Sequence, residues 1–87
     1  YLDLSVRRMQ NGIDVLTQLA AQDATGGWRA EVAAEDARTG CHADPQMPAE
    51  VRDANTVTLT WSCHLRTDWI FDGTPITVES RAVVSGG

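Results

Sequence analysis

The most constraining feature of this 87-residue sequence is a strictly alternating run at positions 56–66. Its even-numbered positions carry hydroxyl, His or Arg side chains, and its odd-numbered positions carry apolar ones. Period-two alternation in a stretch rich in β-branched and aromatic residues is typical of a strand buried on one face. The apolar positions are Val57, Leu59, Trp61, Cys63 and Leu65. We therefore expect a strand whose inner face belongs to the core.

The two cysteines of the chain are Cys63, on the inward face of this strand, and Cys41, near the end of an upstream helical segment. A disulfide closing a loop of this length stabilises a small domain by about 3 kcal/mol in the chain-entropy model, and such bonds persist in oxidising compartments. His42 and His64 follow the cysteines, which leaves a zinc site as an alternative. However, neighbouring strand residues point to opposite faces, and zinc sites usually space paired ligands by two to four residues. The sequence therefore favours a Cys41–Cys63 disulfide and predicts no metal and no cofactor.

Length and charge narrow the function classes. Eighty-seven residues correspond to one domain, 1–87. The net charge is −5, with seven Arg residues that are scattered along the chain, and no Lys. An acidic chain without a basic stripe is a poor nucleic-acid binder. The sequence also contains no apolar run long enough to span a bilayer.

Residues 1–22 carry apolar side chains at alternating spacings of four and three, which predicts an amphipathic helix. Leu4, Val15 and Leu19 are expected to widen its apolar stripe, and Gly12 to mark a close approach of another backbone. No capping residue precedes Tyr1, so we expect the helix to continue upstream and to leave Leu2, Leu4 and Val6 for a neighbour or for the upstream helix. The stripe consists of Leu2, Val6, Met9, Ile13, Leu16 and Ala20.

A second helix is predicted at residues 28–39, after a Gly-Gly break and before Gly40. Its inward edge is expected to consist of Trp28, Val32 and either Ala33 or Ala37. Glu35 is expected on the solvent side, one turn from Arg38, as an exposed ion pair.

Two prolines mark residues 41–55 as mainly a loop, with a short edge strand near Val51. A second long strand is predicted at 75–84, antiparallel to the first. The connection at 67–74 contains Trp69, Ile70 and Phe71. These three either fold under the edge of the sheet or form an exposed contact patch.

An enzyme would have to use Ser62 and His64, with Asp68 or Asp72 nearby. Two residues along a strand separate Ser62 and His64 by about 6–7 Å, too far for a nucleophile–base hydrogen bond unless the side chains converge. The sequence also lacks a phosphate-binding loop and a dinucleotide fingerprint. We therefore predict no catalytic residues and no small-molecule substrate.

The order of these segments resembles a known family. A helix, a glycine break and an Ala/Glu/Arg-rich helix ending in Gly40-Cys41 precede the segment from Val57 to Cys63, and the strand from Gly73 to Val84 closes the chain. This order is similar to that of actinobacterial TadE-like minor pilins of the tight-adherence, or Flp-type, pilus system. The resemblance implies a non-enzymatic, extracytoplasmic protein of the cell envelope, anchored by a transmembrane helix upstream of the first helix. It implies other pilus subunits or assembly proteins as partners.

We therefore expect an α+β domain in which two N-terminal helices pack on a small antiparallel sheet with one disulfide. The leading functional hypothesis is a minor pilin or pseudopilin ectodomain. The alternatives are a secreted, disulfide-stapled binding or inhibitor module that uses residues 69–71, and a small hydrolase built on Ser62 and His64. An apolar run of about twenty residues upstream of Tyr1 would favour the pilin, and a cleavable signal would favour the secreted module.

Overall fold

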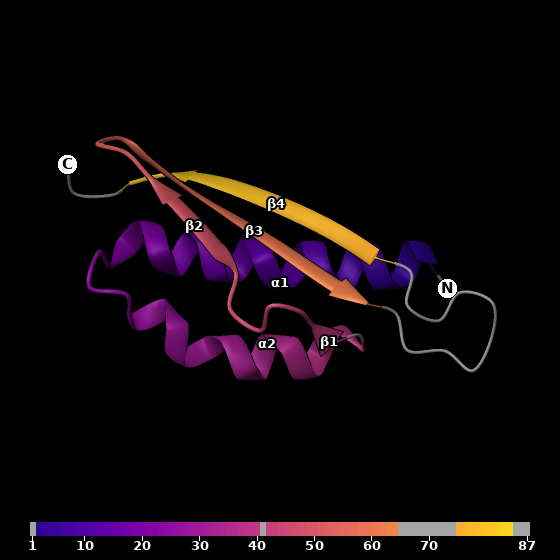
Figure 1. Cartoon of the computed structure of the whole chain (residues 1–87). Helices are drawn as coiled ribbons and strands as arrows, with labels where there is room; N and C mark the ends of the chain where they lie inside the picture. Colours follow the sequence, from indigo (N-terminus) through magenta and orange to yellow (C-terminus); the bar gives the residue numbers. More distant parts are fainter. Residues whose placement is uncertain (1, 41, 65–74, 85–87) are drawn as a thin grey trace.

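The computed structural model describes residues 2–40, 42–64 and 75–84, and it confirms the predicted α+β class. Both α-helices lie on one face of an antiparallel sheet (Figure 1). The elements are, in chain order, α1 (Leu2–Gln22), the 3₁₀ helix η1 (Gly27–Glu31), α2 (Val32–Thr39), β1 (His42–Ala43), β2 (Ala49–Arg52), β3 (Thr56–His64) and β4 (Pro75–Val83).

Strand β3 is the centre of the sheet. Its whole length pairs with β4 on one side, from Thr56 opposite Val83 to His64 opposite Pro75. On its other side β2 pairs with the first part of β3 and β1 with its last part. The sheet therefore has four strands but is only three strands wide at any point.

The core lies between the inner faces of β3 and β4 and the apolar stripe of α1. The C-terminal part of the predicted stripe is confirmed, because Met9, Ile13, Leu16 and Ala20 are all 0% exposed. The expected widening by Leu4 and Val15 is wrong, since these two side chains are 48% and 47% exposed. Residues eleven apart lie about three turns apart on one line of a helix, and here that line faces away from the sheet. The buried side of β3 comprises Val57, Leu59, Trp61 and Cys63.

The second helical segment differs from its prediction in two ways. It begins as the 3₁₀ helix η1, and only residues 32–39 are α-helical. Its inward residues are Trp28, Val32, Glu35 and Thr39, at spacings of four, three and four, whereas Ala33 and Ala37 are exposed. The predicted exposure of Glu35 is therefore wrong. The helical spacing places Glu35, rather than Ala33 or Ala37, on the same side of the segment as Trp28 and Val32, which is the side that faces α1. The predicted Glu35–Arg38 pair is present, at 2.5 and 2.6 Å.

The segment at 41–55 contains more strand than the sequence indicated. The predicted edge strand around Val51 is confirmed as β2, but β1 was not predicted. Two contacts hold β1 in place: the Ala43 amide donates to the Asp36 carboxylate of α2 at 3.0 Å, and the Asp44 amide donates to the Ser62 carbonyl at 2.9 Å. Such partners come from distant parts of the chain, and a two-residue strand has no periodicity of its own.

Gly12, within α1, and Gly40, at the end of α2, differ in how much they would tolerate a side chain. A Cβ placed on Gly12 would lie 3.7 Å from both Glu35 Cβ and Trp61 Cζ3, which is ordinary van der Waals contact. These nearest atoms belong to side chains, so the predicted close approach of another backbone is not found there. Gly40, in contrast, ends α2 with φ 75°, a conformation that L-residues disfavour. Gly12→Ala should therefore raise the free energy of unfolding by up to about 1 kcal/mol, and Gly40→Ala should lower it by about 1 kcal/mol. Urea titration of both variants measures the two shifts, and equal effects of the same sign would contradict this assignment.

Candidate functional site

The N-terminal turns of α1 expose apolar side chains. Val6 and Met9 lie on the same side of the helix, but Met9 is fully buried whereas Val6 is 37% exposed. Leu4 is 48% exposed. The start of α1 therefore extends beyond the part of the sheet that covers the helix. Leu4 and Val6, which the sequence assigned to a neighbour, are thus available for contact, and the backbone of Leu2 precedes them in the same helix.

This end of α1 lies beside the end of β3 and the start of β4 (Figure 1). The turn between β2 and β3 lies at the opposite end of the molecule. The chain thus leaves the sheet at His64 and re-enters it at Pro75 close to the exposed start of α1. Trp69, Ile70 and Phe71, which the sequence suggested as a contact patch, lie outside the described residues.

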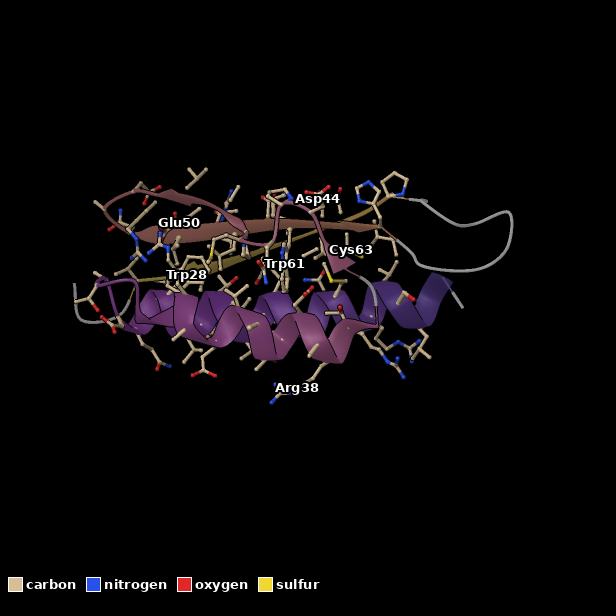
Figure 2. The ribbon with its side chains drawn as sticks, turned by 60° about the horizontal axis from the view of Figure 1, so that its bottom comes forward. Trp28, Arg38, Asp44, Glu50, Trp61 and Cys63 are labelled. Carbon is tan, nitrogen blue, oxygen red and sulfur yellow. The ribbon has the colours of Figure 1, made fainter. Side chains whose placement is uncertain are left out.

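Cys63 also lies near this end, on the inner face of β3, where it is 0% exposed. Its partners in the sheet register are Ala43 of β1 and Ile76 of β4. Figure 2 shows Cys63 between the sheet and the helices, whereas the Arg38 side chain points away from the sheet. Cys41 lies outside the described residues.

Ser62 and His64 lie on the other, solvent-facing side of the sheet. The Ser62 hydroxyl shares a 3.0 Å hydrogen bond with the Thr77 hydroxyl across the β3–β4 pair. His64 is exposed two residues further along the strand. The contact that engages Ser62 is therefore a cross-strand hydroxyl pair of the kind that stabilises sheet surfaces.

A shallow groove runs between α1 and α2, lined by Arg8, Asn11, Val15, Glu35 and Arg38. The Glu35 carboxylate at its base is 5% exposed and is held by the Arg38 guanidinium. The groove is open to solvent, and its one buried charge is already paired.

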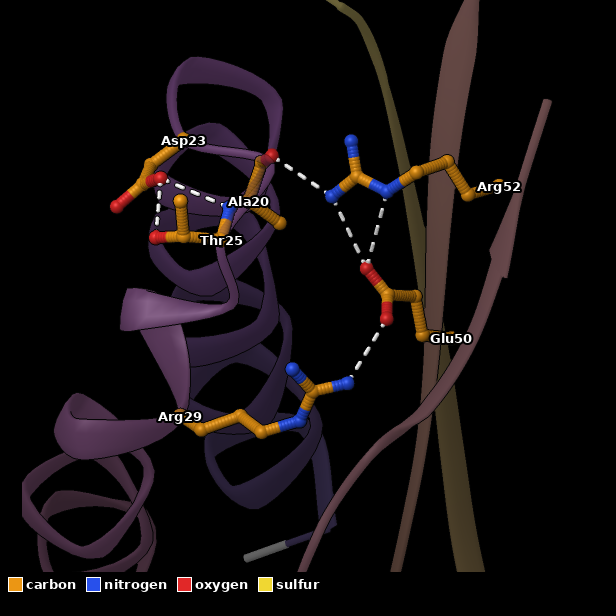
Figure 3. A network of polar contacts seen from close by, with 6 residues as sticks. All are labelled: Ala20, Asp23, Thr25, Arg29, Glu50 and Arg52. Atoms are coloured by element: carbon orange, nitrogen blue, oxygen red, sulfur yellow. Dashed lines mark hydrogen bonds and ion pairs between the residues drawn. The ribbon is translucent and has the colours of Figure 1, made fainter. Parts of the chain in front are cut away.

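Glu50 of β2, which the sequence did not single out, connects polar groups from several elements. Its carboxylate accepts a hydrogen bond from Arg29 of η1 at 2.9 Å and another from Arg52 at 3.0 Å (Figure 3). Arg52 also donates to the Ala20 carbonyl near the end of α1 at 2.9 Å. Glu50 and Arg52 pair with Leu59 and Val57 and so share the inner face of the sheet. The only sequence signal for inward-facing Glu50 and Arg52 is that these two charged residues flank a single apolar residue, Val51.

Two exposed aspartates fix turns. Hydrogen bonds from the Asn55 and Thr56 amides lower the pKa of Asp53, and the Thr25 hydroxyl and amide lower the pKa of Asp23. A carboxyl whose pKa is lower in the folded state stabilises the fold above its unfolded pKa, and that contribution is lost as the pH falls through the folded value. Both turns are therefore favoured at neutral pH and weakened in acid.

No family model, curated protein or solved structure matches this chain. Among the described residues, no three His, Cys, Asp or Glu side chains are grouped so that they could hold a metal ion. None of the helices in the described ranges is both long and apolar enough to cross a membrane.

The Glu50 network should contribute to stability because one carboxylate joins two guanidiniums from different elements. Glu50→Ala should lower the free energy of unfolding by about 1–2 kcal/mol, since partly buried, charge-assisted hydrogen bonds are lost. Glu31→Ala, at an exposed carboxylate of η1, is the matched control and should change it by less than about 0.5 kcal/mol. Urea unfolding measures both, and equal effects would show that the network adds nothing beyond surface charge.

Proposed function

We propose that the chain is a non-enzymatic minor pilin or pseudopilin ectodomain that takes part in the biogenesis or assembly of a tight-adherence, type IV-like pilus. In this proposal the full-length protein is extracytoplasmic and is held in the cell envelope by a transmembrane helix upstream of α1. Its partners are other pilus subunits or assembly proteins. The order of a long helix, a short helix, a cysteine and two long antiparallel strands supports the resemblance on which the proposal rests.

The observation that carries the proposal is the change in burial along α1. The stripe is fully buried from Met9 to Ala20, and it becomes exposed at Val6 without a change to polar residues. Leaving Leu4 and Val6 in water forgoes about 1 kcal/mol or more for each large side chain that could be buried. A helix that packs its C-terminal part on its own sheet and its N-terminal part on a neighbour would recover this energy. This is the arrangement expected of an anchored subunit in an assembly.

The disulfide is part of the same proposal. Cys63 is fully buried, and its register partner Ala43 is two residues from Cys41 along the chain. A Cys41–Cys63 bond would therefore tie β3 to the end of α2, and such a bond suits a protein that works outside the cytoplasm.

The first test of the proposed function is in cells. In a piliated strain that carries the full-length gene, Leu4→Glu combined with Val6→Glu should impair piliation strongly, because two charges are placed on the proposed contact. The purified double variant should keep its melting temperature within about 3 °C, since exposed positions contribute little to the fold. Pili are counted by electron microscopy, with the level of the protein measured in parallel.

Val15→Glu is the matched control, because Val15 is 47% exposed on the same helix but lies beside α2 rather than at the free end. It should leave piliation unchanged. Leu16→Glu, at a fully buried position, should instead unfold the domain. Normal piliation in the Leu4/Val6 variant would contradict the proposed role.

The second test concerns the cysteines. The oxidised chain should be lighter than the fully reduced chain by two hydrogen atoms and should resist alkylation under native conditions. Reduction should lower the free energy of unfolding by about 3 kcal/mol. A Cys41→Ala/Cys63→Ala variant serves as the control, because reductant should not change its stability. A native protein in which both thiols are alkylated would exclude the bond.

A further inference from the structure

The two edges of the sheet differ in how they are protected. On one edge, β1 and β2 are short, and residues 44–48 separate them. There Glu50 and Arg52 point inward from β2, and inward-pointing charges are a common defence against pairing with another strand. On the opposite edge, β4 is nine residues long and pairs only with β3 among the described strands. The β4 edge is therefore the one on which a further strand can be added.

The hydrogen-bond pattern identifies the groups on that edge. The Val84 amide donates toward β3, to the Asn55 carbonyl, at 2.8 Å. Because residues of an antiparallel strand alternate in the side toward which they bond, Thr77, Glu79, Arg81 and Val83 direct their amides and carbonyls away from β3. An independent contact agrees: the Gln10 side-chain amide of α1 donates to the Glu79 carbonyl at 3.1 Å.

The side chains of the same four residues are exposed on the outer face of the sheet. Two of them carry opposite charges two positions apart, at Glu79 and Arg81. Val83 is 75% exposed and is the most exposed large apolar residue in the described structure. The edge therefore presents the order Thr, Glu, Arg, Val at alternate positions.

We propose that β4 of a second copy of this chain pairs with this edge, antiparallel, with Glu79 opposite Arg81 of the second copy. In this register Arg81 also lies opposite Glu79 of the second copy, and Thr77 and Val83 face each other in the same reciprocal way. All four positions form hydrogen-bonded pairs, each of which exchanges two backbone bonds. The strand is thus complementary to itself in both charge and hydrogen bonding.

Neighbouring registers do not share this property. A two-residue shift in one direction places Glu79 opposite Glu79 of the second copy, and a shift in the other direction places Arg81 opposite Arg81 of the second copy. Like charges directly opposite each other destabilise a strand pair. A one-residue shift would set outward-bonding residues against residues already bonded to β3. One register therefore satisfies both requirements.

Gln10 competes with this contact. Its amide occupies the Glu79 carbonyl, which Arg81 of the second copy would use, and it can instead keep its 3.0 Å bond to Asp14. Removing the Gln10 amide should therefore favour self-association. This contact does not depend on the role proposed above for Leu4 and Val6.

Sedimentation equilibrium of the purified 87-residue chain, up to about millimolar concentration, tests the proposal. The chain should form a dimer. Glu79→Arg alone and Arg81→Glu alone should each weaken it about tenfold or more, because two favourable charge pairs become two unfavourable ones. The double variant Glu79→Arg/Arg81→Glu should restore it, since the reciprocal pairs are rebuilt with their signs exchanged. Near-UV circular dichroism checks that each variant is folded.

Gln10→Ala should tighten the dimer about threefold to tenfold, as expected for release of a competing hydrogen bond, whereas Gln18→Ala, at an exposed position of α1, should not. Hydrogen exchange locates the contact: the amides of Thr77, Glu79, Arg81 and Val83 should gain protection as concentration rises. A chain that stays monomeric overturns the proposal. So does a dimer that the charge exchange fails to restore, or one that protects other amides.

Discussion

Strand β3 contacts more of the molecule than any other described strand, because it pairs with β1, β2 and β4 and places its inner face on α1. A two-stranded hairpin is at best marginally stable in water, and most of the stability of a helix in a protein comes from packing its apolar face. Each becomes stable only by burying its apolar face on the other. Trp61 lies at the centre of this contact: it is 1% exposed, lies close to Gly12 of α1, and donates its indole N–H to the Gln46 carbonyl at 3.2 Å. Burial of one face of β3 thus also positions the segment between β1 and β2.

The sequence predicts the helices and strands in which apolar residues recur with the periodicity of a helix or a strand. Alternation identified β3 and β4, and the four-and-three spacing identified α1, because β3 and β4 bury one face and α1 buries its stripe from Met9 to Ala20. Leu4 and Val6 are exposed because the stripe is longer than the part of the sheet that covers it. Their contact with a partner remains a proposal, and so does the disulfide.

Prediction from the sequence fails where a polar side chain is buried because another residue binds it, and not because of the spacing of apolar residues. Glu35 lies inward because Arg38 neutralises it and because the line through Trp28 and Val32 passes through it, whereas the alanines looked more suitable as core residues. Glu50 and Arg52 lie inward because Arg29 and the Ala20 carbonyl bind them. β1 is held by Asp36 and Ser62, which bind the amides of Ala43 and Asp44 at its C-terminal end. Apart from the Glu35–Arg38 pair, which lies one turn apart on α2, the contacts that turn these groups inward join segments that are not adjacent in the sequence.

In β2 the charged side chains of Glu50 and Arg52 face the core and the apolar Val51 faces solvent. The alignment of β2 with β3 is therefore set by charge rather than by burial. Sliding β2 by one residue would bring Val51, now 71% exposed, onto the inner face and turn both charged side chains into solvent. Hydrophobicity alone would favour that slipped alignment. The guanidinium–carboxylate contacts of Glu50 and the turn fixed by Asp53 oppose it. One sheet thus contains two kinds of strand pairing. The stability of the β3–β4 pair depends mainly on temperature and denaturant, whereas that of the β2–β3 pair also depends on ionic strength and pH.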